Sequence, residues 1–111
     1  MTKNKLIYSN NEKYAELLRV SNPERVIENA IKYFNDPNIE VYLSPAKNKK
    51  YMIFTPDYKK RHFGNIDYSD YTKHLNTERR EAYLRRATKI RGKWKDDPYS
   101  PNSLSINLLW E

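Results

Sequence analysis

Apolar residues recur at helical spacing early in the chain. The clearest pattern runs from Pro23 to Asn35, where the apolar positions 26, 27, 30, 31 and 34 share one face. A capping residue, an early proline and a capping-box glutamate open it within 21–24, and Asp36-Pro37 ends it. The sequence therefore predicts an amphipathic helix here, and a weaker pattern over 10–20 predicts a shorter helix before it.

The middle of the chain has the composition of strands. β-Branched and aromatic residues mark three segments, Ile39–Leu43, Lys50–Thr55 and Tyr58–Phe63. Pro56-Asp57 suits a tight turn between the last two segments, and residues 44–49 connect the first two. The pattern predicts a three-stranded antiparallel meander.

Helical spacing returns in the last third of the chain. After a capping threonine at position 77, a narrow apolar stripe is formed by Tyr83, Ala87, Ile90 and Trp94. We expect this stripe to lie on the sheet with the arginines of the helix pointing away. Residues 104–110 are apolar enough to dock in the core as a short helix.

These elements predict an α+β fold: a three-stranded antiparallel meander packed against a basic helix and a short C-terminal helix, preceded by an N-terminal helical segment. A chain of 111 residues buries one modest core, so we expect one compact domain. Within it we distinguish an N-terminal helical extension with the first strand, 1–46, from a basic α+β module, 47–111.

The positive charge of the chain is concentrated after residue 46. Of the formal net charge of +7, residues 1–46 contribute nothing, with six Lys/Arg and six Asp/Glu, whereas residues 47–111 hold fifteen and eight. The densest part is 77–95, with eight Lys/Arg against Glu78 and Glu81. Such a field concentrates anionic partners and speeds their association, as phosphate backbones exploit. The alternative is an ordinary solvated face of a basic helix.

Composition excludes several classes of protein. The chain has no Cys, so it offers neither a disulfide framework nor a thiolate metal site. No apolar run approaches the roughly 20 residues of a membrane span, and the polar start Met1–Lys5 lacks the apolar core of a signal peptide. We therefore expect a soluble, non-secreted protein with no membrane partner.

An ordered string of motifs in the second half of the chain resembles a known family. The motifs lie within Tyr51–Trp110 and are His62-Phe63-Gly64, Tyr68-Ser69-Asp70-Tyr71-Thr72-Lys73-His74, Arg79-Arg80, Tyr83-Leu84-Arg85-Arg86-Ala87, Lys93-Trp94, Tyr99-Ser100-Pro101-Asn102 and Leu108-Leu109-Trp110. This string resembles small uncharacterised basic proteins of large double-stranded DNA viruses and phages. The resemblance implies a viral source, in the virion or in the cytoplasm or nucleus of an infected cell, and implies little chemistry.

Two clusters of basic residues flank the predicted hairpin: Lys47, Lys49 and Lys50 precede its first strand, and Lys59, Lys60 and Arg61 begin its second. A sheet followed by a helix is also similar in layout to the arm-binding domains of tyrosine recombinases, in which the sheet enters the DNA major groove. We expect hairpin geometry to bring both clusters to one side of the sheet, where they meet phosphates, with Tyr51 and Tyr58 available to stack on exposed bases. The alternative is that each cluster is an ordinary basic turn beside aromatic core residues. The predicted nucleic-acid-binding residues are Lys47, Lys49, Lys50, Lys59, Lys60, Arg61, Arg79, Arg80, Arg85, Arg86, Lys89, Arg91 and Lys93.

No arrangement of residues points to catalysis. His62 and His74, with Asp67 and Asp70, follow no recurrent metal-ligand spacing. The chain has two glycines, so a phosphate-cradling glycine-rich loop is excluded, and it has neither a nucleophile elbow nor a thiol nucleophile. Packing of a tyrosine-rich loop explains residues 68–74 better than a tyrosine nucleophile with a helper base. We expect no enzyme activity, no metal and no cofactor.

Two functions remain, and they differ in the partner. In the first, the protein binds nucleic acid, DNA in preference to RNA, through the sheet edge and the arginine-rich helix. The helix Pro23–Asn35 then contributes packing or a homodimer contact, and the affinity falls steeply with salt. In the second, the protein is an internal virion component that joins capsid proteins, whose acidic faces replace phosphates.

Overall fold

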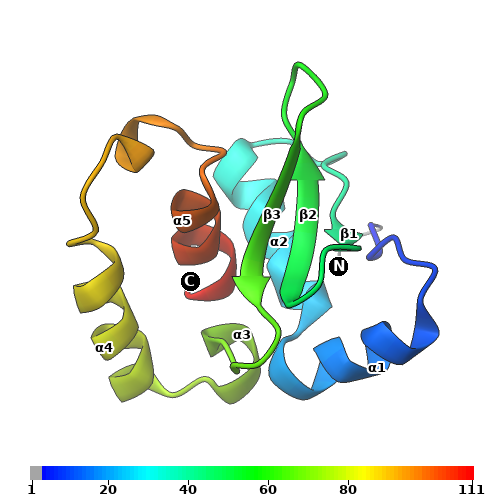
Figure 1. Cartoon of the computed structure of the whole chain (residues 1–111), viewed down its shortest axis with the longest axis horizontal. Coiled ribbons are helices and arrows are strands. Elements are labelled where there is room, and N and C mark those ends of the chain that lie inside the picture. The colour runs from blue at the N-terminus through cyan, green and yellow to red at the C-terminus, as the bar shows by residue number, and fades with distance from the viewer. Residues whose placement is uncertain (1–3) are drawn as a thin grey trace.

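A three-stranded antiparallel sheet lies at the centre of the computed structural model, which describes residues 4–111 (Figure 1). The strands are β1 (Tyr42–Leu43), β2 (Lys49–Phe54) and β3 (Lys60–Asn65), and they lie side by side in that order. Tyr51 pairs with Phe63 in the middle of the β2–β3 ladder. The predicted meander and the α+β class are therefore confirmed.

The first strand is shorter than predicted, and Ile7 from the N-terminal segment pairs alongside it. β1 holds two residues, and Ile39 lies outside it. Ile7 forms a parallel bridge with Tyr42, in which the Ile7 N–H donates to the Val41 carbonyl at 3.0 Å and the Leu43 N–H donates to the Ile7 carbonyl at 2.9 Å. The N-terminal segment thus pairs with backbone groups that would otherwise form an open sheet edge.

Two capped helices precede the sheet. α1 (Asn11–Val20) begins after Asn10 and α2 (Pro23–Phe34) begins after Asn22, and each asparagine side chain accepts a bond from the backbone N–H three residues on. Asn35 ends α2 in the left-handed conformation, with φ 50°. Both predicted N-terminal helices are present.

Five short or medium helical segments follow the sheet. They are α3 (Tyr71–His74), α4 (Thr77–Ala87), η1 (Trp94–Asp96), α5 (Pro101–Leu104) and the π-helical turn η2 (Ser105–Leu109), which continues α5. Leu104, Leu108 and Leu109 are buried, so the C-terminal segment docks in the core as predicted. Among residues 4–111, no helix combines the length and the apolar character needed to cross a membrane.

The basic helix is shorter than predicted and does not lie on the sheet. α4 ends at Ala87, so Ile90 lies in the following loop with 53% of its surface exposed, and Trp94 begins η1. Because Ile90 is more than half exposed, a longer helix would gain little packing from it, and an unpacked helical end is marginal in water. α5 lies between α4 and β3 (Figure 1), and Tyr83 of α4 stacks on Trp110 instead of on a strand.

One hydrophobic core joins the two parts of the chain that differ in charge. Residues 1–46 supply Leu17, Val26, Ile27, Ala30, Val41 and Leu43, and residues 47–111 supply Tyr51, Ile53, Phe63, Leu104, Leu108 and Leu109. The predicted packing role of helix α2 is confirmed by its place in this core. The C-terminal segment packs on α2 and on β3, so both parts of the chain build its surroundings.

Candidate nucleic-acid interface

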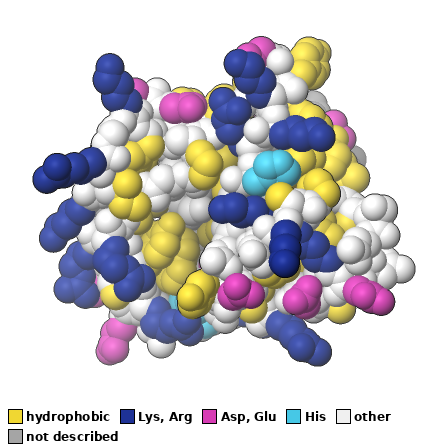
Figure 2. Space-filling view, in the orientation of Figure 1, with side chains coloured by type: hydrophobic (Ala, Val, Ile, Leu, Met, Phe, Trp, Pro, Cys, Tyr) yellow, Lys and Arg dark blue, Asp and Glu magenta, His cyan; other side chains and the backbone are white. Residues whose placement is uncertain are grey.

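An open cleft of about 830 Å³ lies between α4 and the edge of the sheet. One wall is formed by β3, the start of β2 and the loop after β3; the other is formed by α4, and the C-terminal segment closes the bottom. Figure 2 shows this hollow with hydrophobic side chains inside it and Lys and Arg side chains around it. The residues that line it come from segments far apart in the sequence.

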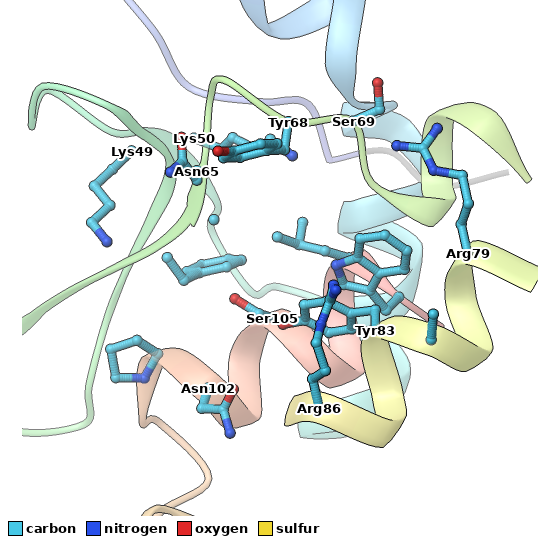
Figure 3. Close-up of a pocket in the computed structure, with 16 residues that line it drawn as sticks. Lys49, Lys50, Asn65, Tyr68, Ser69, Arg79, Tyr83, Arg86, Asn102 and Ser105 are labelled. Atoms are coloured by element: carbon cyan, nitrogen blue, oxygen red, sulfur yellow. The ribbon is translucent and has the colours of Figure 1, made fainter. Parts of the chain in front are cut away.

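Arginines reach the cleft from two turns of α4. Asn76 caps this helix, and its Oδ1 accepts a bond from the Arg79 N–H at 3.0 Å. Arg79 and Arg86 are two helical turns apart and therefore share one side of α4, and Figure 3 shows both beside the cavity. A cation in the first turn opposes the helix dipole by about 0.3–1 kcal/mol, so helix stability does not explain Arg79.

Three of the four basic side chains that line the cleft have no carboxylate partner among the described residues. Within residues 4–111 the ion pairs are Lys50–Asp70 and Lys59–Asp57. Lys49, Arg79 and Arg86 therefore lack an acidic partner among the described residues, and the described lining of the cleft contains no Asp or Glu. Unpaired cations around a hollow favour an anionic ligand.

The bottom of the cleft is aromatic and already organised. The rings of Tyr83 and Trp110 stack with centroids 4.2 Å apart and planes inclined by 10°. His74 lies beside the indole at 5.3 Å, and Arg80 Nε donates to the Trp110 carbonyl at 2.7 Å. Burial raises the pKa of the Tyr83 hydroxyl, so this ring stays neutral. The stacked pair offers a fixed apolar surface to a ligand.

Lys50 supports the cleft and is not available to bind nucleic acid. Its Nζ donates to Asp70 Oδ2 at 3.0 Å, and its side chain is 3% exposed. Asp70 also caps α3: its carboxylate accepts hydrogen bonds from the backbone N–H and the hydroxyl of Thr72. Burial lowers the pKa of Lys50, and the charge of Asp70 opposes this shift. The prediction for Lys50 was wrong, because β2 is buried on both faces from Lys50 to Ile53 and only Lys49, at its start, stays exposed.

Two further predicted contacts have structural roles. Tyr51 is fully buried, stacks on Phe63 and shares a 2.7 Å hydrogen bond with Ser21, so it cannot stack on bases. Burial raises its pKa well above the ordinary value. Arg80 is held by the Trp110 carbonyl and by the face of the Tyr71 ring, 5.5 Å from its guanidinium carbon. The stacking prediction for Tyr51 was wrong because its ring is buried, whereas Arg80 is half-exposed and its contact with nucleic acid stays a prediction.

The two lysine clusters lie at opposite ends of the hairpin. Lys49 pairs with Asn65 and Lys60 pairs with Phe54, which separates the clusters along the ladder by roughly 17 Å. Because each cluster lies at the start of a strand and the two strands run in opposite directions, the clusters do not adjoin one another, and their joint contact with phosphates stays a prediction. Tyr58, 86% exposed, lies at the turn between the strands, where its stacking role stays a prediction.

The other predicted contacts are exposed but do not line the cleft. Figure 2 shows Lys and Arg side chains gathered along the edge of the molecule that α4 and the following loop form in Figure 1. The exposed or half-exposed predicted residues outside the cleft are Lys47, Lys59, Lys60, Arg61, Arg85, Lys89, Arg91 and Lys93. They extend the positive field around the cleft without shaping it.

Sequence reasoning did not assign the polar and aromatic lining of the cleft to a site. Tyr68, Asn65, Asn102 and Trp110 line it, and Figure 3 shows the first two on the strand side and Asn102 on the C-terminal segment. Tyr83 lies four residues after Arg79 and three before Arg86, a spacing that puts all three on one helix face. That signal was present in the sequence; the contribution of Trp110 was not.

The histidines hold local hydrogen bonds. His62 Nδ1 lies 2.7 Å from Ser44 Oγ, and His74 Nδ1 accepts a bond from the Asn76 N–H at 2.9 Å. Burial lowers the pKa of both rings. In the part of the chain that the structure describes, no three His, Cys, Asp or Glu side chains are grouped to hold a metal ion.

In comparisons with known proteins, part of the chain matches a protein family. Residues 39–87 match the model of a family of unknown function (DUF5754). No curated protein matches the chain, and no solved structure matches it. The matched segment includes all three strands, α3 and α4, and ends before the C-terminal segment. Over both walls of the cleft, the chain is therefore similar to an uncharacterised family.

Proposed function

We propose that the protein binds nucleic acid by holding backbone phosphates along the cleft between α4 and β3. The observation that supports this function is the arrangement of Lys49, Arg79 and Arg86 around one hollow that has no acidic residue in its described lining. Guanidinium groups suit phosphate oxygens because they donate two parallel hydrogen bonds. Contacts of this kind position a nucleic acid without reading its sequence.

The exposed lysines and arginines outside the cleft would contribute a longer-range attraction. They lie in the β1–β2 connection, at the turn and strand start between β2 and β3, and along the edge formed by α4 and the loop after it. Such charges steer a polyanion toward the cleft and make association dependent on ionic strength. The nucleic acid is then held at the cleft and attracted by the surrounding field.

A viral role is the second part of the proposal. The resemblance of residues 51–110 to small basic proteins of large double-stranded DNA viruses and phages supports it, with viral or host DNA as the ligand. The competing partner is a capsid protein with an acidic surface, which the same basic residues could bind. Binding to nucleic acid in the absence of other proteins separates the two.

Fluorescence polarisation with random single-stranded and duplex DNA tests the proposal. We expect saturable binding at 50 mM salt and a loss of roughly 20- to 40-fold in affinity at 200 mM, the dependence that three phosphate contacts produce. The double variant Arg79→Glu/Arg86→Glu should bind neither ligand measurably.

A matched control carries the same change in net charge. Arg19 and Lys32 are exposed and lie in the last turns of α1 and α2, away from the cleft. The variant Arg19→Glu/Lys32→Glu should bind within about 3-fold of the unmodified protein if steering alone is reduced. Equal losses in the two variants would assign binding to overall charge, and no saturable binding at 50 mM salt would sink the proposal.

A further inference from the structure

We propose, on the basis of the function proposed above, that the cleft takes a single strand and seats an unpaired base against its aromatic side chains. Phosphate binding requires only the cations of the rim. It does not explain why the same hollow has an apolar interior made of Tyr83, Trp110 and Leu109. A ligand that is anionic on one side and planar and apolar on the other accounts for both halves of the lining.

Tyr68 adds an aromatic ring at the mouth of the cleft. It is 68% exposed, yet it lines the cavity together with Asn65 and Ser69. The loop that carries it is held at both ends, because the Ile66 N–H donates to the Asn48 carbonyl at 2.9 Å and Asp70 is buried with Lys50. Tyr68 is thus an exposed ring on an anchored loop, which lowers the entropic cost of contact with a ligand.

Two amides offer polar contacts to a base edge. Asn65 Oδ1 accepts a bond from the Asp67 N–H at 2.9 Å, and Asn102 Nδ2 donates to the Ala87 carbonyl at 3.1 Å. These bonds fix the two side chains and leave the Asn65 amide nitrogen and the Asn102 amide oxygen for other partners. Amide groups pair readily with the edges of unpaired bases.

Size and stacking together select a single strand. The cavity of about 830 Å³ is within the range of about 300–1,000 Å³ that small ligands occupy. A base inside a duplex is stacked on both faces and reaches such a pocket only after it is flipped out, at a cost of a few kcal/mol. An unpaired base has a free face and stacks on aromatic side chains without that cost.

The experiment compares three ligands of equal phosphate number: a thymidine single strand, an abasic single strand and a blunt duplex. We expect the thymidine strand to bind about 5- to 140-fold more tightly than the abasic strand, the ratio that stacking of one base supplies. The duplex should bind no better than the abasic strand. Equal affinity for the thymidine and abasic strands, or tighter binding of the duplex, would overturn the single-strand proposal and leave phosphate binding intact.

Two variants test the role of the Tyr68 ring. Tyr68→Ala should lose at least about 5-fold in affinity for the thymidine strand and nothing for the abasic strand, and Tyr68→Phe should keep the affinity of the unmodified protein. Because Tyr68 is exposed, neither variant should change the melting temperature. If Tyr68→Ala weakens both strands equally, the ring does not contact a base.

The chain has two tryptophans, and one of them reports on the bottom of the cleft. In a Trp94→Phe variant, excited selectively at the red edge of tryptophan absorption, the remaining tryptophan fluorescence comes from Trp110. We expect the thymidine strand to quench it and the abasic strand to leave it unchanged, since only a base can approach the stacked rings. Unchanged fluorescence at saturating thymidine strand would overturn the proposal. The absence of saturable binding by all three ligands would overturn it together with the proposed function.

Discussion

Adjacent lysines at positions 49 and 50 have opposite roles. Lys49 is exposed and lines the cleft, whereas Lys50 is buried and paired with Asp70. A buried charge is tolerated only when it is paired, and removing one partner leaves the other desolvated and uncompensated. The pair also joins β2 to the capping residue of α3, so its loss affects the wall of the cleft as well as the core.

The two lysines permit a crossed test of stability and binding. Lys50→Met should lower the free energy of unfolding by about 3–5 kcal/mol, because Asp70 remains buried without its cation. Lys49→Met should change it by no more than about 0.5 kcal/mol and should weaken binding to DNA. Urea denaturation and fluorescence polarisation measure the two effects. A Lys50→Met protein as stable as the unmodified one would contradict the structural role assigned to the pair.

At the scale of elements, β3 and the C-terminal segment meet at a residue without a side chain. Gly64 has φ +81°, and a Cβ there would lie 2.8 Å from Leu109 Cδ1 and 3.1 Å from Lys50 Cδ. Leu109 is buried and lines the bottom of the cleft. The close approach of β3 to η2 therefore depends on glycine at this position.

A substitution at each glycine separates backbone strain from crowding. Gly92 also has a positive φ, +113°, but a Cβ there would meet nothing within 4 Å. Gly64→Ala and Gly92→Ala should each lower the free energy of unfolding by about 1–3 kcal/mol through backbone strain. Gly64→Ala should lower the free energy of unfolding by about 1–3 kcal/mol more than Gly92→Ala does, because the Leu109 side chain must move. Melting curves of the two variants measure the difference, and equal losses would show that the contact with Leu109 adapts without cost.

At the scale of the whole molecule, the net charge comes from one part of the chain, whereas the core is built from both parts. The net positive charge lies after residue 46, but six of the twelve buried residues of the core cluster precede it. The cleft likewise needs β2, β3, α4 and the C-terminal segment at once. A small protein that loses half of its core side chains exposes their partners to water and loses the burial that stabilises it.

We therefore expect the fragment 47–111 to be unfolded in isolation, although it holds all the excess charge. Circular dichroism and urea titration should show no cooperative transition for it. The full chain of 111 residues is the control, and it should unfold cooperatively. A cooperative transition in the fragment would show that the basic part folds without α2.

The sequence by itself determined those features that depend on nearby residues. Helix α2 was predictable because its cap, its proline and its apolar face lie within a short segment. The meander followed from strand composition and from Pro56-Asp57, and the docking of the C-terminal segment followed from its leucines. The arginines of α4 were predicted as a group because a local excess of positive charge can be counted from the sequence alone.

Only the tertiary structure decided which of these basic residues surround one hollow. The end of α4 at Ala87, the burial of Lys50 and the use of Arg80 to hold Trp110 all depend on partners distant in the sequence. The residues that line the cleft are scattered between positions 49 and 110, and no local sequence pattern predicts that they lie close together. Propensity and charge act over a few residues, whereas burial and pairing are set by the packing of the whole chain, and for that reason the site emerged only from the fold.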